Sequence, residues 1–248
     1  MRILRFLKYL REKSRTNSEF KTRFDTFRRL ATEAGNRMPV EWDDRFPCLD
    51  DETDGLDFDR HYVYHMAWAM RVLTRTMPEL HVDVSSRLDF AALASAIVPV
   101  QLFEYRQPDL VLDQLQVMQG DLLNLPVTDS SVHSLSCMHV IEHVGLGRYG
   151  DQMDADGDMK AIAELKRVLA PGGQLLFVVP IGRPRVQFNA HRIYSFEHVR
   201  KQFSGFELAE FALIPDKAQD GHLVFNASPE LCSAQNYGCG CFLFRKPT

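Results

Sequence analysis

The chain has 248 residues, of which 45% are hydrophobic and 25% charged, and its formal net charge is −4. This composition is typical of a globular protein long enough to bury a core, and it excludes the strongly basic class that binds nucleic acid. The five cysteines are odd in number and scattered, which predicts free thiols rather than a disulfide framework. No apolar run approaches the roughly 20 residues that span a bilayer, and basic residues interrupt the first hydrophobic stretch, unlike a secretory signal. We therefore expect a cytoplasmic protein.

The first 57 residues differ in charge from the rest. Residues 1–30 hold ten Lys or Arg against three acids, whereas residues 41–59 hold nine acids against Arg45 alone. Ile3, Phe6, Leu7 and Leu10 recur at spacings of three and four, which predicts one apolar face of a basic amphipathic helix. Such a helix either lies on the anionic inner face of a membrane as a peripheral contact or packs against protein. We assign residues 1–57 to a basic helical extension followed by an acidic linker.

From residue 58 onward the pattern is that of one α/β domain. Apolar residues at helical spacing over 60–77 predict a helix that covers a sheet. β-like runs at 80–86, 100–106, 115–123, 132–141 and 174–181 then alternate with helical runs such as 88–98 and 157–173. This alternation predicts a doubly wound, mainly parallel sheet with helices on both faces. The last two strand candidates, 221–227 and 238–246, have no helix between them, which indicates an antiparallel C-terminal edge.

His139-x-x-Glu142-His143 spells a zinc-peptidase pattern that needs both histidines on one helical face. Here the motif follows a β-like run and precedes three glycines in "VGLGRYG", so a helix is poorly supported. In open α/β sheets, ligands bind beyond the carboxyl ends of the strands. Residues 139–151 lie at such an end, and we expect them to serve a site other than a metal centre.

The order of elements from Leu80 to Pro180 resembles the class I S-adenosylmethionine-dependent methyltransferase fold. The pairing of "IEHVGLGRYGD" with "FNAHRIYS" resembles an uncharacterised bacterial branch of it, often associated with surface-polysaccharide gene clusters. The resemblance covers roughly residues 58–200. It implies a Rossmann-like domain with a seven-stranded sheet over residues 58–248, and S-adenosylmethionine as the cofactor.

The resemblance also implies roles for residues at the ends of the strands. Asp83, Ser85 and Ser86 occupy the place of the family's first loop, beneath the amino-acid moiety of the cofactor. Glu104 matches the acid that accepts hydrogen bonds from the ribose, Asp121 and Leu122 match the pair that contacts adenine, and His139 borders the methyl group. Carboxylates suit these places because they accept hydrogen bonds from hydroxyl and amino donors.

The first loop, "DVSSRLDF", departs from the family because it lacks the usual glycines, which let the backbone approach the cofactor closely. Either Ser85 or Ser86 supplies hydroxyl and amide donors instead, or the loop no longer holds the cofactor. The second alternative describes a non-catalytic binding protein or scaffold with a methyltransferase fold.

Methyl transfer needs an oriented nucleophile and a base that takes its proton. Histidine suits that step near neutral pH, and His143 or His191 is our candidate base, with Glu142 or Asp151 to orient it. The acceptor that the resemblance implies is a sugar or glycoconjugate of polysaccharide biosynthesis. Its candidate binding residues are Arg148, Tyr149, Asp151, Asn189 and Arg192. A third alternative is the metal-dependent hydrolase that the literal His-x-x-Glu-His pattern suggests.

Overall fold

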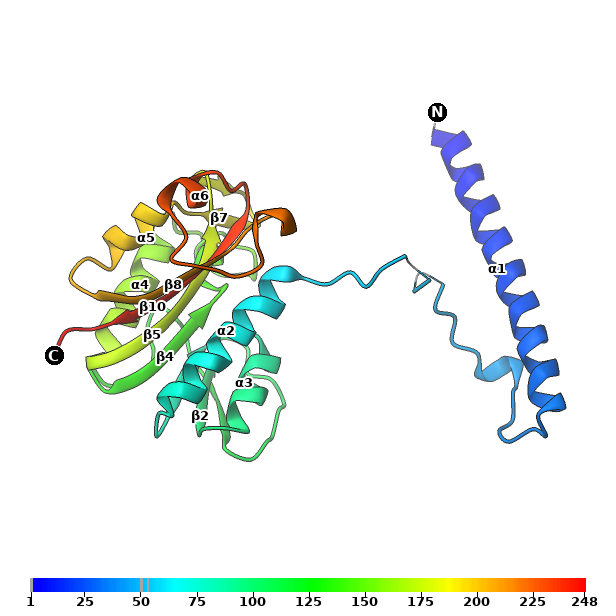
Figure 1. The fold of residues 1–248 in the computed structure, drawn as a ribbon, viewed down its shortest axis with the longest axis horizontal. Coiled ribbons are helices and arrows are strands. Elements are labelled where there is room, and N and C mark those ends of the chain that lie inside the picture. Colours follow the sequence, from blue (N-terminus) through cyan, green and yellow to red (C-terminus); the bar gives the residue numbers. More distant parts are fainter. Residues whose placement is uncertain (1, 50, 53) are drawn as a thin grey trace. The chain divides into compact units, whose positions relative to one another are not determined.

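A computed structural model describes residues 2–49, 51–52 and 54–248, with side chains in the first helix described from residue 18 onward. Its contacts divide the chain into two compact units, Met1–Asp57 and Phe58–Thr248 (Figure 1). No helix in the described part of the chain combines the length and the apolar character that crossing a bilayer requires.

The first unit contains the long helix α1 (Arg2–Glu33) and the short 3-10 helix η1 (Trp42–Asp44). The ring of Trp42 lies edge-on to Phe24 at 4.9 Å, and the Arg45 guanidinium lies 4.4 Å above the Trp42 ring. The helix predicted over the basic segment is therefore present. Its predicted apolar face of Ile3, Phe6, Leu7 and Leu10 consists of side chains outside the described part.

The second unit is built on a mixed sheet with strand order β3-β2-β1-β4-β5-β10-β8-β9. The first five strands in this order are parallel, and β10 runs antiparallel to both of its neighbours. The predicted doubly wound sheet with an antiparallel edge is confirmed, and the two-residue β9 adds an eighth strand to the seven expected. The strands are β1 (His81–Val84), β2 (Val100–Glu104), β3 (Leu115–Gln119), β4 (Val132–Met138), β5 (Leu169–Ile181), β8 (Glu207–Ile214), β9 (Val224–Phe225) and β10 (Gly238–Arg245).

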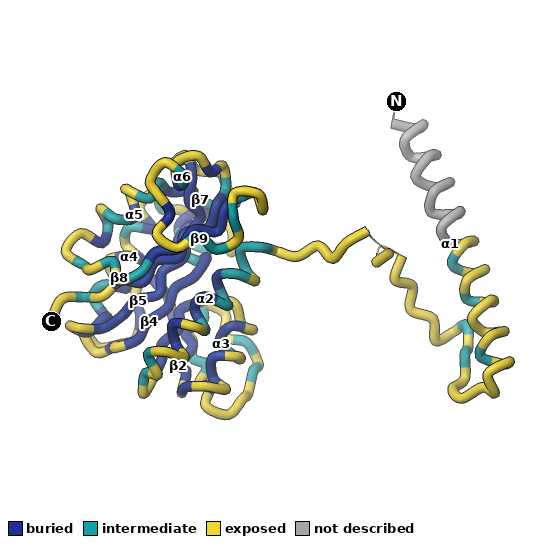
Figure 2. Tube along the Cα trace, in the orientation of Figure 1, coloured by how far each residue is buried: buried dark blue, intermediate teal, exposed yellow. Residues whose placement is uncertain are grey.

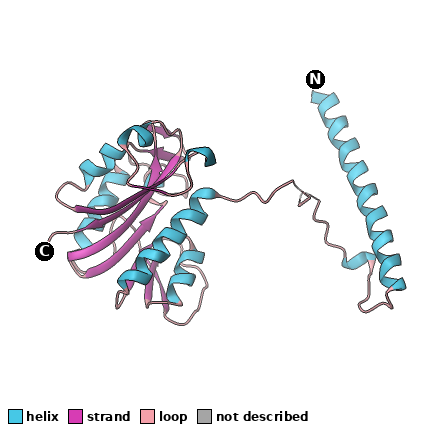
Figure 3. Ribbon diagram, viewed as in Figure 1, coloured by secondary structure: helices cyan, strands magenta, loops and turns pink. Residues whose placement is uncertain are grey.

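Helices cover both faces of this sheet (Figure 3). Strand β5 shows why, since Leu175, Phe177 and Val179 belong to one buried cluster, whereas Leu176 and Val178 belong to the other. Successive side chains of a strand point to opposite faces, so a strand this apolar needs cover on both sides. The covering helices are α2 (Arg60–Thr76) and α3 (Leu88–Ser95) on one face, and α4 (Gly157–Val168) and α5 (Phe196–Gln202) on the other.

Helix α2 begins at a clear sequence signal. The side chain of Asp59 accepts a hydrogen bond from the backbone N–H of Tyr62 at 3.2 Å, as an N-cap does. Its buried residues include Trp68, Val72 and Leu73, so the helical spacing seen in the sequence corresponds to the face that packs on the sheet. Each such side chain stabilises the fold by about 1.5–3 kcal/mol when it leaves water.

The remaining elements lie near the carboxyl ends of the strands. Strands β6 (Arg185–Gln187) and β7 (His191–Ile193) pair as a separate hairpin, and the 3-10 helix η2 (Ile141–His143) follows β4. The 3-10 helix η3 (Ala218–Asp220) and α6 (Pro229–Ser233) lie between β8 and β10. In Figure 2 the strands of the sheet are buried, while the loops beyond them alternate between buried and exposed residues.

Candidate functional site at the carboxyl ends of the strands

A pocket of about 480 Å³ lies at the carboxyl ends of the parallel strands. Four neighbouring strands contribute to it, through Ser85 after β1, Glu104 at the end of β2, Asp121 after β3 and His139 after β4. Parallel strands bring these ends to one rim, which is where open α/β sheets bind ligands. The volume falls within the range of roughly 300–1,000 Å³ typical of small-molecule sites.

The glycine-free loop after β1 is held by side-chain hydrogen bonds. Ser85 has φ of 52°, in the left-handed region that favours glycine, and its hydroxyl donates to the carbonyl of Phe103 at 3.3 Å. The Ser86 hydroxyl accepts from the backbone N–H of Met138 at 3.1 Å. Serine thus makes the turn that glycine makes elsewhere, and Ser85 still lines the pocket.

Asp83 lies behind this loop and not in the pocket. It is fully buried, and its carboxylate accepts hydrogen bonds from the Ser86 N–H at 3.2 Å and from the Ser136 hydroxyl. Burial raises the pKa of Asp83 to about 7, although these hydrogen bonds oppose the shift. The expectation that Asp83 contacts a ligand directly is therefore corrected, because its side chain supports the Ser85–Ser86 turn instead.

The two acids at the neighbouring strand ends do face the pocket. Partial burial raises the pKa of Glu104, and the nearby Ser85 hydroxyl and Arg106 guanidinium oppose that shift. Asp121 uses one carboxylate oxygen to accept from the Leu123 N–H at 2.9 Å. Leu122, next to Asp121 in the chain, is buried and supplies an apolar part of the wall. The pocket therefore offers two hydrogen-bond acceptors beside an apolar surface.

A second pocket of about 490 Å³ adjoins the first. Both pockets are lined by Ser85, His139, His143 and Tyr149, so these four residues lie where the two meet. The rest of the second pocket combines aromatic and basic side chains with one buried carboxylate. It is lined by Tyr62, Ser86, Arg87, Met138, Glu142, Arg148, Ala190, His191 and Tyr237.

Of the predicted catalytic residues, His143 lies at this junction, whereas Glu142 and His191 line only the second pocket. Nδ1 of His143 lies 2.7 Å from the carbonyl oxygen of Ala190, so Nδ1 carries the proton and Nε2 keeps a lone pair. Burial lowers the pKa of His143, against the attraction of Glu142, whose carboxylate oxygen lies 3.9 Å from Nε2. The imidazole is therefore neutral at pH 7 and can accept a proton.

Glu142 is fully buried and holds His139. Its Oε1 lies 2.7 Å from Nδ1 of His139, whereas Oε2 of Glu142 and Nε2 of His139 have no hydrogen-bond partner among the described residues. Burial raises the pKa of Glu142, but His139 and His143 together lower it by more, so the net shift of the pKa is downward. The carboxylate is charged at neutral pH.

His191 lines only the second pocket and not the first. Its Nε2 lies 2.7 Å from Oε1 of Gln187, and its ring stacks on Tyr237 with a centroid distance of 4.7 Å. Partial burial lowers its pKa. This places His191 on the wall of the second pocket, farther from the junction than His143.

The loop over residues 144–155 is organised by Asp151 and Arg192. The Asp151 carboxylate accepts from the backbone N–H groups of Gly145 at 2.9 Å, Tyr149 at 3.1 Å and Gly147 at 3.3 Å. Arg192 is buried and donates to the carbonyl of Val144 at 2.6 Å and to the carbonyls of residues 154 and 155. Asp151 thus organises the loop from within the first pocket, whereas Arg192 supports the loop from behind.

Two of the predicted substrate residues are therefore corrected. Arg192 lines neither pocket, because its guanidinium donates hydrogen bonds to backbone carbonyls of the 144–155 loop. Asn189 is exposed in the segment between β6 and β7 and also lines neither. Asp151 lines the first pocket, Arg148 lines the second and Tyr149 lines both, and their role in binding an acceptor stays a prediction.

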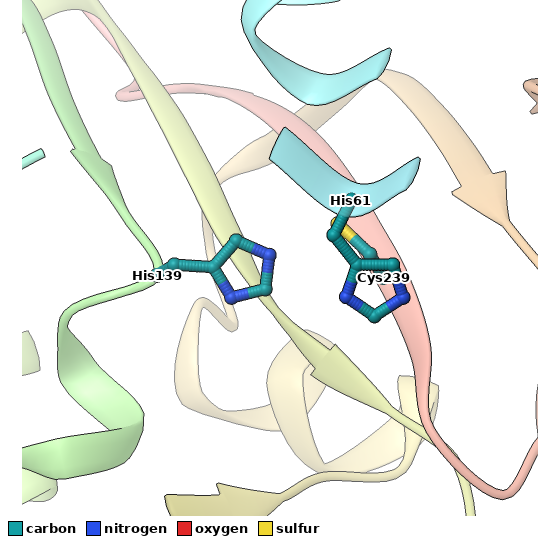
Figure 4. Close-up of side chains that lie close together, drawn as sticks. All are labelled: His61, His139 and Cys239. Atoms are coloured by element: carbon teal, nitrogen blue, oxygen red, sulfur yellow. The ribbon is translucent and has the colours of Figure 1, made fainter. Parts of the chain in front are cut away.

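His139 and His143 do not stand on one helical face. His139 follows a strand with φ of 56°, and His143 ends a 3-10 helix three residues long. A different group of metal-type ligands converges, namely His61 of α2, His139 and Cys239 of β10, whose ligand atoms lie within 4.8 Å of one another (Figure 4). Sequence reasoning missed His61 and Cys239, because the three positions are too far apart in the chain to form a spacing motif.

The comparisons with known proteins agree with this architecture. A family model described as "Caenorhabditis protein of unknown function, DUF268" matches residues 128–221, which include both the 139–151 loop and the segment around His191. No curated protein matches the chain.

Solved structures of the same fold are numerous. The 1,6-didemethyltoxoflavin-N1-methyltransferase of Burkholderia thailandensis, with bound S-adenosylhomocysteine, superposes with a TM-score of 0.53 at 12% identity over 74% of this chain and 79% of that one. The N-methyltransferase NodS of Bradyrhizobium japonicum, in complex with S-adenosylhomocysteine, superposes with a TM-score of 0.53 at 13% identity, over 77% of this chain and 90% of that one. The [4+2]-cyclase SpnF superposes with a TM-score of 0.51 at 15% identity, over 74% of this chain and 81% of that one. At these identities the likeness shows that the domain has the fold of S-adenosylmethionine-dependent methyltransferases.

Proposed function

We propose that the domain over residues 58–248 is an S-adenosylmethionine-dependent methyltransferase that acts on a hydroxyl oxygen of a sugar or glycoconjugate. The observation that carries the proposal is the pair of adjoining pockets that share His139 and His143. One pocket suits a nucleoside and the other an acceptor, and methyl transfer needs two bound partners that meet in line.

The first pocket fits the cofactor in the chemistry of its donors and acceptors. Glu104 and Asp121 are carboxylates at successive strand ends, as required to accept hydrogen bonds from ribose hydroxyls and an adenine amino group. Leu122 and Val140 supply an apolar surface for the adenine ring. The turn at Ser85 and Ser86 replaces the glycine loop, and its hydrogen bonds argue for an intact site rather than a degenerate one.

When bound, the cofactor supplies a methyl group activated by a sulfonium centre. His143 is our candidate base, because it lines both pockets and its Nε2 lone pair is available at neutral pH. Its Nδ1–H, fixed by the carbonyl of Ala190, sets the tautomer. Glu142, 3.9 Å from Nε2, stabilises the imidazolium that forms when His143 takes the proton of the acceptor.

The second pocket supports a polar, neutral or anionic acceptor. Tyr62, Tyr149 and Tyr237 combine apolar ring faces with hydroxyl groups, which suits a ligand that alternates C–H and O–H groups. Arg148 adds a positive charge at the same wall and suits a phosphate attached to a sugar. The surface-polysaccharide setting is a further part of the proposal and comes from the sequence resemblance.

The test is methyl transfer from S-adenosylmethionine with a tritiated methyl group to a panel of nucleotide sugars. We expect label in at least one sugar, loss of about 100- to 10,000-fold in kcat for His143→Gln, and an effect mainly on KM for His191→Gln. His133→Gln is the matched control, because His133 is exposed on β4 and lines neither pocket.

The failures of this experiment are distinguishable. Full activity of His143→Gln contradicts the assignment of the base. S-adenosylhomocysteine binding without label in any sugar contradicts the acceptor class. Absence of cofactor binding contradicts the enzyme and favours the non-catalytic alternative.

A further inference from the structure

We propose that His61, His139 and Cys239 bind a zinc ion at the edge of the second pocket. The three side chains come from helix α2, the loop after β4 and strand β10, and their ligand atoms lie within 4.8 Å of one another. In Figure 4, His61 and Cys239 lie together on one side of His139. The site does not depend on methyl transfer, and none of its residues is required by the proposed cofactor site except His139.

The first argument is the unsatisfied nitrogen of His139. Its side chain is buried, with 8% of the residue exposed, and its Nε2 has no hydrogen-bond partner in the part of the chain that the structure describes. Buried polar atoms in native proteins almost always have a partner, so an unpaired ring nitrogen requires an explanation. A metal ion bound to Nε2 satisfies it.

The second argument is the partner on the other side of the same ring. Nδ1 of His139 lies 2.7 Å from Oε1 of the buried Glu142. Histidines that bind metals commonly donate their second ring N–H to a carboxylate, which fixes the tautomer and raises the basicity of the ligand nitrogen. The Glu142–His139 pair has this arrangement, with Nε2 directed away from the carboxylate toward the cluster.

The third argument is the identity of the ligands. Two imidazoles and one thiol form a set that binds zinc and disfavours magnesium and calcium, which prefer oxygen. The His61 ring is further held by stacking on the Tyr237 ring, with a centroid distance of 5.0 Å. Three protein ligands leave a fourth position open, as in catalytic rather than structural zinc sites.

The geometry needs a modest adjustment. Nitrogen and sulfur ligands of one tetrahedral zinc ion lie about 3.3–3.8 Å apart. The ligand atoms of the three side chains lie up to 4.8 Å apart, so zinc binding would bring them about 1 Å closer together. The His61 ring now lies between His139 at 5.6 Å and Tyr237 at 5.0 Å, both roughly parallel to it. Rotation of the half-buried His61 side chain out of this stack supplies the movement.

This arrangement reassigns the literal His139-x-x-Glu142-His143 motif. His139 acts as a ligand and Glu142 as the carboxylate that positions it, but His143 points elsewhere, to the carbonyl of Ala190. The other two ligands come from distant segments. A sequence pattern that suggests a two-histidine metal site thus marks one ligand of a different site.

The test uses the full chain, expressed without a histidine tag in medium with added zinc, and measured by elemental mass spectrometry. We expect one zinc ion per chain, lost in Cys239→Ala and in His61→Gln. Cys232→Ala is the matched control, because Cys232 is also a buried free thiol but lies in α6, outside the cluster. The His61 variant protects the test against a folding defect of Cys239→Ala, since His61 is only half-buried.

Cobalt substitution gives a second readout. A thiolate-to-cobalt absorption band is expected in the wild type and in Cys232→Ala, and not in Cys239→Ala. Glu142→Gln should keep the band but weaken metal affinity about 10- to 100-fold, as loss of a carboxylate behind a ligating histidine does. Absence of zinc from the wild type, or equal zinc in His61→Gln and the control, would overturn the proposal.

Discussion

Asp83 is an ionisable residue whose burial has a measurable consequence. Its carboxylate is fully buried between the Ser86 N–H and the Ser136 hydroxyl, which also lies 2.9 Å from Nε2 of His81. Burial raises its pKa from 3.8 to about 7. The folded state therefore holds this proton more tightly than the unfolded state, and stability that is present below pH 4 is lost as the pH rises through 7.

The substitution Asp83→Asn tests directly how much stability the protein loses when Asp83 ionises. An asparagine copies the protonated acid, since its oxygen can accept from Ser86 while its amide donates to the Ser136 oxygen. Between pH 5 and 8 the stability of the variant should rise relative to wild type by about 3 kcal/mol, which is the part of the roughly 4 kcal/mol for the raised pKa that develops in this pH range. Urea unfolding at several pH values measures it, with the exposed Asp109→Asn as control. Parallel profiles for wild type and Asp83→Asn would contradict the raised pKa.

At this scale the sequence predicted positions better than roles. The residues Ser85, Glu104, Asp121 and His139 line one pocket, because each lies at the end of a strand or within two residues of it. The ends of strands can be predicted from a sequence. Asp83 and Arg192 were wrong as ligand contacts, because a strand-end acid or a loop arginine looks the same in sequence whether it faces a pocket or supports the loop from behind.

The loop between η2 and α4 is the element on which both pockets depend. It carries three glycines with positive φ, and they are not equivalent. A Cβ at Gly145, with φ of 78°, would lie 2.2 Å from the carbonyl oxygen of Asp154, whereas a Cβ at Gly150, with φ of 83°, would meet nothing within 4 Å. The chain approaches itself closely at the first position and not at the second.

Gly145→Ala and Gly150→Ala form a matched pair. Both add the cost of a left-handed alanine, about 1–2 kcal/mol, and Gly145→Ala adds a backbone clash of about 1–3 kcal/mol more. We expect Gly145→Ala to be the more destabilised in urea, with faster amide exchange at Gly147 and Tyr149, whose N–H groups bind Asp151. Equal free energies of unfolding for the two variants would count against this account of the loop.

Sequence reasoning also had limits at the scale of elements. The β-like run before residues 139–143 and the glycines after them gave poor support for a helix there, and the structure has only the three-residue 3-10 helix η2. Sequence reasoning did not predict that α2 and β10 would bring His61 and Cys239 beside His139, because β10 inserts between β5 and β8. Strand order is a property of tertiary packing, and local spacing carries no record of it.

At the scale of the whole molecule, the fold was predictable and the partners were not. The alternation of strand and helix patterns fixed a parallel sheet with one rim, and physical rules for handedness left few topologies. The basic amphipathic segment over residues 1–30 remains a prediction, either of a helix that lies on an anionic membrane surface or of one that packs against protein. The acceptor remains a proposal for a related reason, since many reactions share this fold.

The central claim is that the rim formed by β1, β2, β3 and β4 is a nucleoside site, with Glu104 as the acceptor for the ribose hydroxyls. Calorimetric titration with S-adenosylhomocysteine tests it most directly, on wild type, on Glu104→Gln and on Glu79→Gln, whose parent residue is exposed and outside both pockets. We predict saturable binding to wild type and Glu79→Gln. Glu104→Gln should bind about 10- to 100-fold more weakly, the loss expected for hydrogen bonds to a charged group. Equal affinity of Glu104→Gln and Glu79→Gln, or absence of binding to the wild type, would contradict the claim.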